Sequence, residues 1–393
     1  MSKTSERKLR LGVAGLGRAF SVMLPAFVGD ERVTLVAGAD TRPEAQQRFA
    51  AEFSVVGYST VEELCADPAV EAVYVATPHQ YHAQHAVLAA RHGKHLLVEK
   101  PIALTLDECN IMLDAVHRAR VHLVVGHSHS FDAPVQRLHT LVKSGEFGGV
   151  RMINAINYTD YLYRPRRPEE LDTAKGGGAV FNQAAHQVDI VRLVGGGRVS
   201  SVRAVTGAWD SRRPTDGAYA ALLTFDNGAF ASLTYNGYGH FDSDELEGWI
   251  GEMGQQKTPY SASPRPRFAN MAEEASLKDA RNYGGREYRR NAAQPVAHQH
   301  FGTLLVSCER ADLRAVPTGV MIYQDGAARL DALAPRAVPR SEVIDELYQA
   351  VVHGKAPLHD GAWAMATLEI LLAILRSARE GCDVHPTRQV GVP

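Results

Sequence analysis

The chain has 393 residues, of which 45% are hydrophobic and 22% charged, proportions typical of a globular protein of about two domains. Its formal net charge of −2 gives no basic field for nucleic acid or an anionic membrane, so we expect neither as a partner. The polar N-terminus shows no signal-peptide pattern, and no apolar stretch approaches membrane-spanning length. Four scattered cysteines form no CxxC pair, which predicts neither a disulfide framework nor a zinc site. We therefore expect a cytoplasmic protein.

Up to about residue 126, apolar runs alternate with helical stretches. The apolar runs predict strands at 9–14, 33–39, 70–76, 95–99 and 121–126. The stretches between them predict helices at 18–29, 43–53, 60–66, 80–92 and 105–119. Such alternation is typical of a doubly wound parallel sheet, so residues 1–126 are predicted to form an α/β domain of the Rossmann type.

Beyond residue 126 the pattern changes, and residues 127–393 are predicted to form an α+β domain with a large, mostly antiparallel open sheet. Its strands are expected near 150–159, 201–209, 218–225, 229–236, 303–308, 313–316, 319–324 and 327–331. Helices are expected at about 132–144, 341–353 and 361–380. Asp226-Asn227-Gly228 predicts a hairpin turn. Residues 254–296, rich in Pro, Gly, Arg and Asn, predict a long excursion from the sheet.

The first predicted strand ends in the glycine turn Gly15-Leu16-Gly17-Arg18-Ala19. Such a turn lets the backbone approach a pyrophosphate, which the N–H groups of the next helix then face. The third glycine of the usual G-x-G-x-x-G pattern is missing, because Phe20 stands there. Asp40 ends the second strand, where a carboxylate accepts hydrogen bonds from the adenosine ribose and repels a 2′-phosphate. These features predict NAD as the cofactor, and Arg42 keeps NADP as the alternative.

A second motif, Glu99-Lys100-Pro101, follows another apolar run at the edge where parallel sheets present ligand-binding groups. A lysine shielded beside the cationic nicotinamide would have a lowered pKa, which suits a general base near neutral pH. Glu99 would either orient Lys100 and touch the nicotinamide ribose or serve the fold. A nucleotide site and an ionisable lysine at one sheet edge predict redox chemistry on a small-molecule substrate.

The chain resembles the glucose–fructose oxidoreductase/inositol dehydrogenase/rhizopine-catabolism (Gfo/Idh/MocA) family across nearly its whole length. The resemblance rests on these motifs: Gly15-Leu16-Gly17-Arg18, Ala76-Thr77-Pro78 with His82, Glu99-Lys100-Pro101, Gly126 through Phe131-Asp132, Lys143 to Gly148, Gly176-Gly177-Gly178 with His186 and Asp189, and Arg376 to Gly381. It implies an N-terminal Rossmann domain and a C-terminal α+β domain whose open sheet forms a homo-oligomer, a dimer or a tetramer.

The resemblance also assigns roles to single residues. The family's catalytic lysine maps onto Lys100 and its histidine onto His186, whereas Asn182 stands where the family has an acid. An amide cannot take a proton, although it can orient a hydroxyl group, so general-base work would fall on Lys100 with His186 assisting. Ala76, Thr77, Pro78 and His82 would lie by the cofactor, and Asp189 would be structural.

Within the family, the chain is similar to dehydrogenases that oxidise the cis-4,5-dihydrodiol of phthalate to 4,5-dihydroxyphthalate. The similarity rests on Val125 to Asp132 and Tyr161 to Pro168. It implies that His127 and His129 face the substrate. The alternatives are an inositol or sugar dehydrogenase and, from another class, a cofactor-binding regulator. A regulator has no need of a base, which weighs against it.

Three arginines, Arg164, Arg166 and Arg167, cluster before the triple glycine. Two vicinal carboxylates on a substrate need guanidinium partners more than a sugar does, and the alternative is a solvated loop. Histidines 79, 82 and 85 recur at helical spacing, but no cysteine or carboxylate completes a metal site with them, so no metal is predicted.

Overall fold

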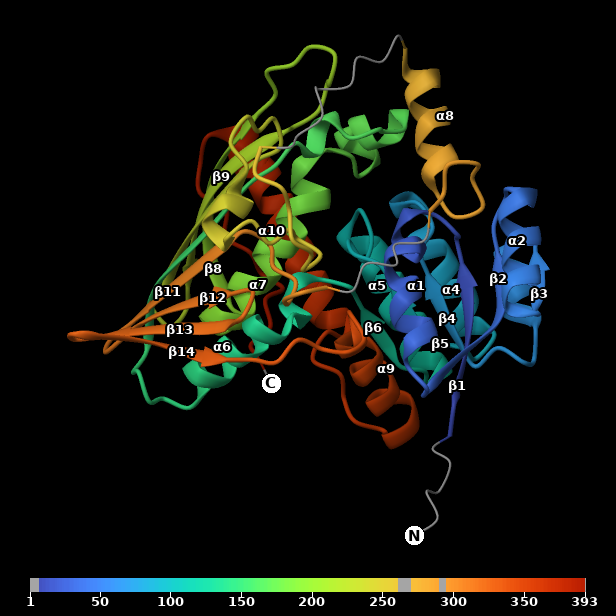
Figure 1. Cartoon of the computed structure of the whole chain (residues 1–393), viewed down its shortest axis with the longest axis horizontal. Helices are drawn as coiled ribbons and strands as arrows, with labels where there is room; N and C mark the ends of the chain where they lie inside the picture. The colour runs from blue at the N-terminus through green and yellow to red at the C-terminus, as the bar shows by residue number, and fades with distance from the viewer. Residues whose placement is uncertain (1–6, 261–269, 290–294, 393) are drawn as a thin grey trace. The chain divides into compact units, whose positions relative to one another are not determined.

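The computed structural model describes residues 7–260, 270–289 and 295–392 (Figure 1). The chain forms two compact units, of which the first comprises Met1–His127, Ser276–Asn291 and Ala337–Met365. The second unit comprises Ser128–Ala275, Ala292–Arg336 and Ala366–Pro393. The predicted boundary between residues 126 and 127 lies close to the end of the first segment. The sequence assigned the two later segments of the first unit to the C-terminal domain, because nothing in their local pattern ties them to the N-terminal sheet.

The first unit contains a parallel sheet of six strands in the order β3-β2-β1-β4-β5-β6. The strands are β1 (Leu9–Ala14), β2 (Val33–Ala39), β3 (Val56–Tyr58), β4 (Ala72–Val75), β5 (His95–Val98) and β6 (Leu123–Val125). This order confirms the predicted doubly wound sheet. The edge strand β3 was not predicted, since a strand of three partly exposed residues is too short to show a period.

The helices between these strands are α1 (Arg18–Gly29), α2 (Pro43–Phe53), α3 (Val61–Ala66), α4 (His82–Arg91) and α5 (Leu106–Ala119). Two of them begin at a capping box, in which a threonine side chain and a glutamate three residues later bond each other's backbone N–H groups. Thr60 with Glu63 starts α3, and Thr105 with Glu108 starts α5. Helix α9 (Ser341–His353) also belongs to this unit.

The predicted excursion over 254–296 contains one helix, α8 (Met271–Arg281), and its residues 261–269 and 290–294 lie outside the described residues. After α8 the chain packs on the first unit through Tyr283, which is fully buried. The Tyr283 ring lies 5.1 Å from the ring of Phe20 between centroids, and its hydroxyl donates to Glu52 at 2.8 Å. The phenylalanine at the place of the third glycine thus packs against a side chain from far along the sequence.

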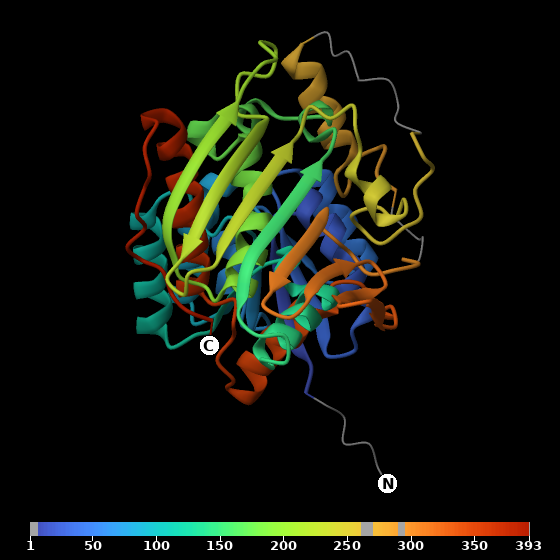
Figure 2. The same ribbon diagram turned by 90° about the vertical axis from the view of Figure 1, so that its left-hand side faces the viewer.

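The second unit contains an eight-stranded sheet, which faces the viewer in Figure 2. Its strands are β7 (Val150–Tyr158), β8 (Val199–Gly207), β9 (Ala218–Phe225), β10 (Phe230–Asn236), β11 (Thr303–Cys308), β12 (Asp312–Val316), β13 (Gly319–Gln324) and β14 (Ala327–Ala332). All neighbours pair antiparallel except β7 and β10, which confirms the mostly antiparallel sheet. The predicted hairpin joins β9 to β10.

The two faces of this sheet differ. Helices α6 (Ala133–Lys143) and α7 (Ala185–Gly195) pack on one face and bury alternate residues of the strands. On the opposite face, large apolar side chains remain exposed, among them Ile156, Leu222 and Phe230.

A buried polar network holds helix α7 in place within the second unit. Asp189 accepts hydrogen bonds from the hydroxyls of Ser130 and Thr367. Arg192 is fully buried, and it donates to Thr367 at 2.7 Å and to the carbonyl of Gly197 at 3.1 Å. A buried charge is tolerated only when its hydrogen bonds are made, so these contacts hold the helix in one position.

One helix among the described residues, α10 (Gly361–Glu380), is long and apolar enough to cross a membrane by length and composition. Within this helix, 67% of the most apolar window is buried in the protein. Core helices of soluble proteins pass the same test, so this helix is weak evidence for a membrane span.

Candidate active site

The glycine turn of the first unit lies directly against the loop that follows β4. Gly15 has a φ of +94°, and a Cβ atom there would lie 2.7 Å from the carbonyl oxygen of Ala76. Only glycine allows this approach. Helix α1 begins after Gly17 with no side-chain cap and no acid in its first turn, so its N–H groups are available to an anion.

The carboxylate of Asp40, at the end of β2, accepts a hydrogen bond from the backbone N–H of Leu16 at 2.8 Å. Arg42 donates to the same carboxylate from Nε at 3.0 Å and from Nη2 at 3.1 Å. Arg42 Nη2 also donates to the Leu16 carbonyl at 2.8 Å. The acid therefore lies over the glycine turn as predicted for a ribose-binding group, and the charge of Arg42 is paired inside the protein.

His82 joins the loop after β4 to the loop after β5. Its Nδ1 lies 2.8 Å from the Pro101 carbonyl oxygen and its Nε2 lies 2.8 Å from the Thr77 carbonyl oxygen. The side chain is fully buried, and burial lowers the pKa of His82 to about 4. His85 contacts the Thr77 hydroxyl at 3.0 Å. These contacts account for two of the three periodic histidines, and the described residues contain no metal-binding group of three.

Lys100 follows Glu99 directly after β5 and is partly exposed. Glu99 is buried and accepts a hydrogen bond from the Tyr74 hydroxyl at 2.5 Å. Burial raises the pKa of Glu99, although the Tyr74 hydrogen bond and the charge of Lys100 oppose the shift. These contacts favour a structural role for Glu99. Its side chain fixes the end of β5, directly before Lys100.

In the second unit, Asn182 closes the triple-glycine turn. Its amide Nδ2 donates to the carbonyl of Gly176 at 3.1 Å and to that of Gly178 at 2.9 Å. A carboxylate has no hydrogen to donate, so an aspartate at position 182 of this chain would leave both carbonyls facing a negative charge. The residue lies in a π-helical turn, Val180–Ala184, that leads into α7, and such turns are frequent at functional sites.

His186, on α7, lies in a cluster of rings. Its ring centroid lies 4.8 Å from that of His129 and 4.7 Å from that of Phe301. His129 has Asp132 2.6 Å from Nδ1 and Glu252 3.4 Å from Nε2. Burial lowers the pKa of His129, but the two carboxylates outweigh burial and raise it. His127, the last residue of the first segment of the first unit, is also buried.

The three clustered arginines have different surroundings. Arg166 stacks on the Tyr161 ring at 3.8 Å and donates to the Tyr161 carbonyl at 2.6 Å, so its guanidinium group stabilises the loop that carries it. Arg167 bonds Glu170 through its backbone N–H at 2.8 Å. The side chain of Arg164 is 47% exposed and donates to Asp160 at 2.9 Å. Arg164 is therefore the member best placed to meet a ligand.

No pattern in the sequence indicated Glu252 or Phe301 as neighbours of His129. Both are distant along the chain, and single-sequence periodicity carries no information on such contacts. Asp132 was recognisable only as part of a family motif, yet it is the closest charged partner of His129. The described residues thus form two groups, one around the glycine turn and Lys100, and the other around His129 and His186.

Replacing Asp40 with Ser should reduce the preference for NAD over NADP. The native enzyme is expected to have a higher kcat/KM for NAD, because the Asp40 carboxylate accepts from ribose hydroxyls and repels a phosphate. In the variant, the ratio of kcat/KM for NAD to kcat/KM for NADP should fall at least about tenfold, because a charged hydrogen bond contributes about 1.5–3 kcal/mol. Steady-state kinetics with both cofactors measure the ratio. A native preference for NADP would contradict the assignment and point to Arg42.

Comparisons with known proteins agree with this arrangement. The family model described as an oxidoreductase family with an NAD-binding Rossmann fold matches residues 9–127, and the GFO/IDH/MocA C-terminal domain matches residues 135–249. A 1-carboxy-3-chloro-3,4-dihydroxycyclohexa-1,5-diene dehydrogenase from Comamonas testosteroni is 45% identical over 378 residues, which cover 94% of this chain and 95% of that protein.

Solved structures show the same fold. A dehydrogenase from Bordetella bronchiseptica is 41% identical with a TM-score of 0.89, covering 96% of this chain and 100% of that chain. The WlbA dehydrogenase from Bordetella pertussis, in complex with NADH and UDP-GlcNAcA, is 23% identical with a TM-score of 0.69, covering 97% of this chain and 99% of that chain. The chain belongs to the Gfo/Idh/MocA family and is an NAD-dependent oxidoreductase.

Proposed function

We propose that this enzyme oxidises a carboxylated cis-dihydrodiol to the corresponding catechol, and that its substrate is the cis-4,5-dihydrodiol of phthalate. The observation that carries the proposal is the 45% identity, over nearly both chains, to a dehydrogenase whose name specifies a carboxylated dihydroxycyclohexadiene. The guanidinium group of Arg164, whose side chain is 47% exposed, supports a substrate with carboxylates. We also propose a cytoplasmic location, where NAD is available to such a reaction.

In the proposed mechanism, Lys100 takes the proton of one substrate hydroxyl. Bound NAD supplies the acceptor for the hydride that leaves the same carbinol carbon. A carbonyl forms there, and the neighbouring carbinol carbon then loses its proton while the carbonyl oxygen gains one. The product is an aromatic catechol, which makes the oxidation strongly favourable.

The other residues orient the substrate and hold Lys100. His82 bonds the Pro101 carbonyl, so it positions the backbone next to Lys100. Asn182 holds the glycine turn through two hydrogen bonds from its amide nitrogen, and it would orient a substrate hydroxyl. His186, His129 and Arg164 would lie on the side of the substrate.

Replacing Lys100 with Met should lower kcat by at least about 10²-fold, the lower limit of the usual contribution of a general base. NAD affinity, measured by fluorescence titration, should stay near the native value, because the glycine turn and Asp40 are unchanged. Lys143→Met, at an exposed lysine of α6, serves as the control and should turn over normally. Full activity of Lys100→Met would rule out this mechanism.

Replacing Arg164 with Gln should raise KM for the phthalate dihydrodiol by about tenfold, the lower end for a charged hydrogen bond, because the side chain is half exposed. The KM for a benzene cis-dihydrodiol, which has no carboxylate, should hardly change. Arg212→Gln, at an exposed arginine, is the control. If native activity is equal on both diols, or if inositols and aldoses are better substrates, the proposed substrate is wrong.

We also propose that the enzyme is a homo-oligomer, a dimer or a tetramer, assembled through the exposed apolar face of the eight-stranded sheet. Leu222 and Phe230 are 46% and 40% exposed on this face. Replacing Leu222 with Lys should put a charge into the interface and shift the mass measured by light scattering towards the monomer. A native monomer at micromolar concentration would contradict the proposal.

A further inference from the structure

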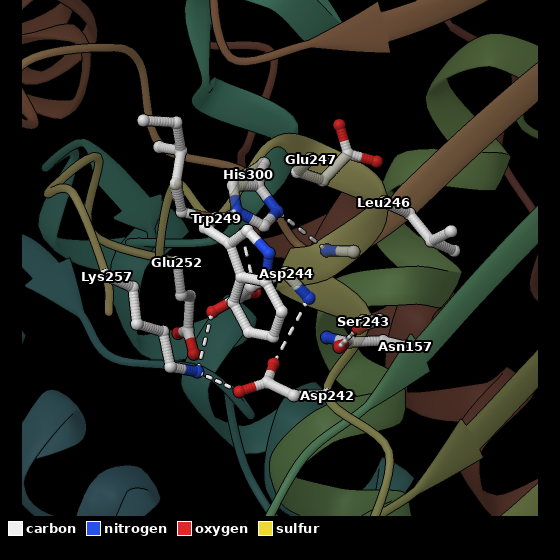
Figure 3. Close-up of polar contacts among 12 residues, drawn as sticks. Asn157, Asp242, Ser243, Asp244, Leu246, Glu247, Trp249, Glu252, Lys257 and His300 are labelled. Carbon is white, nitrogen blue, oxygen red and sulfur yellow. Dashed lines mark hydrogen bonds and ion pairs between the residues drawn. The ribbon is translucent and has the colours of Figure 1, made fainter. Parts of the chain in front are cut away.

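The long excursion is anchored in the second unit before its later residues join the first. At its start, Lys257 binds the carboxylates of Asp242 and Asp244 (Figure 3). Helix α8 follows, and the residues Ser276–Asn291 belong to the first unit. The helix therefore begins in one unit and ends in the other, and the excursion supplies the N-terminal unit with a segment from the second half of the chain.

Tyr283 of this segment packs between α1 and α2. Its ring centroid lies 5.1 Å from that of Phe20 on α1 and 6.3 Å from that of Phe49 on α2, and its hydroxyl donates to Glu52 at 2.8 Å. Strand β2 leaves room for Phe49, because a Cβ atom at Gly38 would lie 2.7 Å from the Phe49 ring. Where the usual fingerprint has its third glycine for close helix packing, this chain has an aromatic contact that the excursion completes.

Gly284 brings the same segment against the first turn of α2. Its φ is +82°, and a Cβ atom there would lie 2.6 Å from the Cα and 2.9 Å from the backbone nitrogen of Ala45. Only glycine allows an approach this close at such a φ. The segment thus touches the backbone of α2 with no flexible side chain between them, so a shift of one must move the other.

The turn that Gly284 touches also holds Asp40. The backbone N–H groups of Ala45 and Gln46 donate to the Arg42 carbonyl at 3.1 and 3.2 Å. Gln46 Nε2 donates to the Asp40 carbonyl at 2.5 Å, and Arg42 Nε donates to the Asp40 carboxylate at 3.0 Å. The acid predicted to bind the ribose is therefore fixed through the residues on either side of Ala45.

We propose that Tyr283 and Gly284 are positioning residues of the cofactor site, which hold the first turn of α2 so that Asp40 meets the adenosine ribose. The proposal goes beyond the function proposed above, because it concerns the cofactor and is independent of the substrate. It rests on the ribose contact predicted for Asp40. The cofactor site is then not complete within residues 1–126 and depends on a segment far along the chain.

The test measures NADH binding to the full-length enzyme by fluorescence titration. Gly284→Ala should raise the Kd of NADH by about threefold to tenfold, because a displaced Asp40 loses part of a charged hydrogen bond. Gly93→Ala is the matched control, since Gly93 lies in the same unit at a φ of +71° and a Cβ atom there would have no neighbour within 4 Å. This control introduces similar backbone strain and should leave the Kd unchanged.

A double-mutant cycle separates positioning from a general loss of stability. In the Asp40→Ser background, Gly284→Ala should change the Kd of NADH by less than about twofold, because the carboxylate through which it acts is gone. In the native background, Gly284→Ala should weaken NADH more than NADPH, since Asp40 binds the ribose of NADH and repels the 2′-phosphate of NADPH.

Tyr283→Phe keeps the ring and should bind NADH as the native enzyme does, whereas Tyr283→Ala should raise the Kd. Hydrogen exchange of the native enzyme provides a measurement that needs no variant. NADH should slow exchange at residues 282–288 more than in α5 of the same unit, because coupling between two sites is reciprocal.

An equal effect of Gly284→Ala in both backgrounds, or no effect in either, would overturn the inference. Exchange at residues 282–288 that NADH leaves unchanged would overturn it too. No dihydrodiol enters these measurements, so a failure of the proposed function would not alter their outcome.

Discussion

The chemistry of the first unit depends on one geometric constraint, which is that parallel strands end at the same edge of a sheet. Residues far apart in the sequence, from Gly15 to Lys100, are brought to that edge by β1, β2, β4 and β5. The close approach of Gly15 to Ala76 draws two of these loops together, and His82 ties the second loop to the third. The cofactor site is thus a consequence of strand order, with one glycine and one histidine setting its fine geometry.

The second unit holds its charged side chains in two different ways. Asp189 and Arg192 have their hydrogen bonds satisfied by groups of the fold, so they stabilise α7 and are not available to a ligand. His129 and Arg164 have acidic partners that differ in exposure, from the buried Asp132 to the half-exposed Glu252 and Asp160. A buried pair fixes a side chain, whereas an exposed partner can be exchanged for solvent or ligand.

Local patterns in the sequence were sufficient for most strands and helices, because each has a clear period or a cap, as at Thr60 and Thr105. They also placed Asp40 directly after β2, where the prediction that it binds the ribose puts it. Features that depend on distant contacts were missed. Strand β3 and helix α8 lacked a strong pattern, and the neighbours of His129 come from a loop more than a hundred positions away.

The arginine cluster shows the same limit at the level of single residues. The spacing in the sequence does not distinguish Arg164, Arg166 and Arg167. In the structure, Arg166 stacks on the aromatic ring of Tyr161. The sequence predicted that general-base work falls on Lys100, because Asn182 replaces an acid and an amide cannot take a proton. Its two bonds to the glycine turn give the substitution a positive structural role that no local pattern could show.

The packing of Tyr283 on Phe20 has a consequence for how the protein is made. A ribosome adds about 5–20 residues per second, so Phe20 emerges roughly ten seconds or more before its partner. During that interval the groove between α1 and α2 lacks the ring that fills it, and an apolar surface is open to solvent or chaperones. Although the N-terminal sheet is encoded first, its domain cannot reach its final packing until most of the chain has been synthesised.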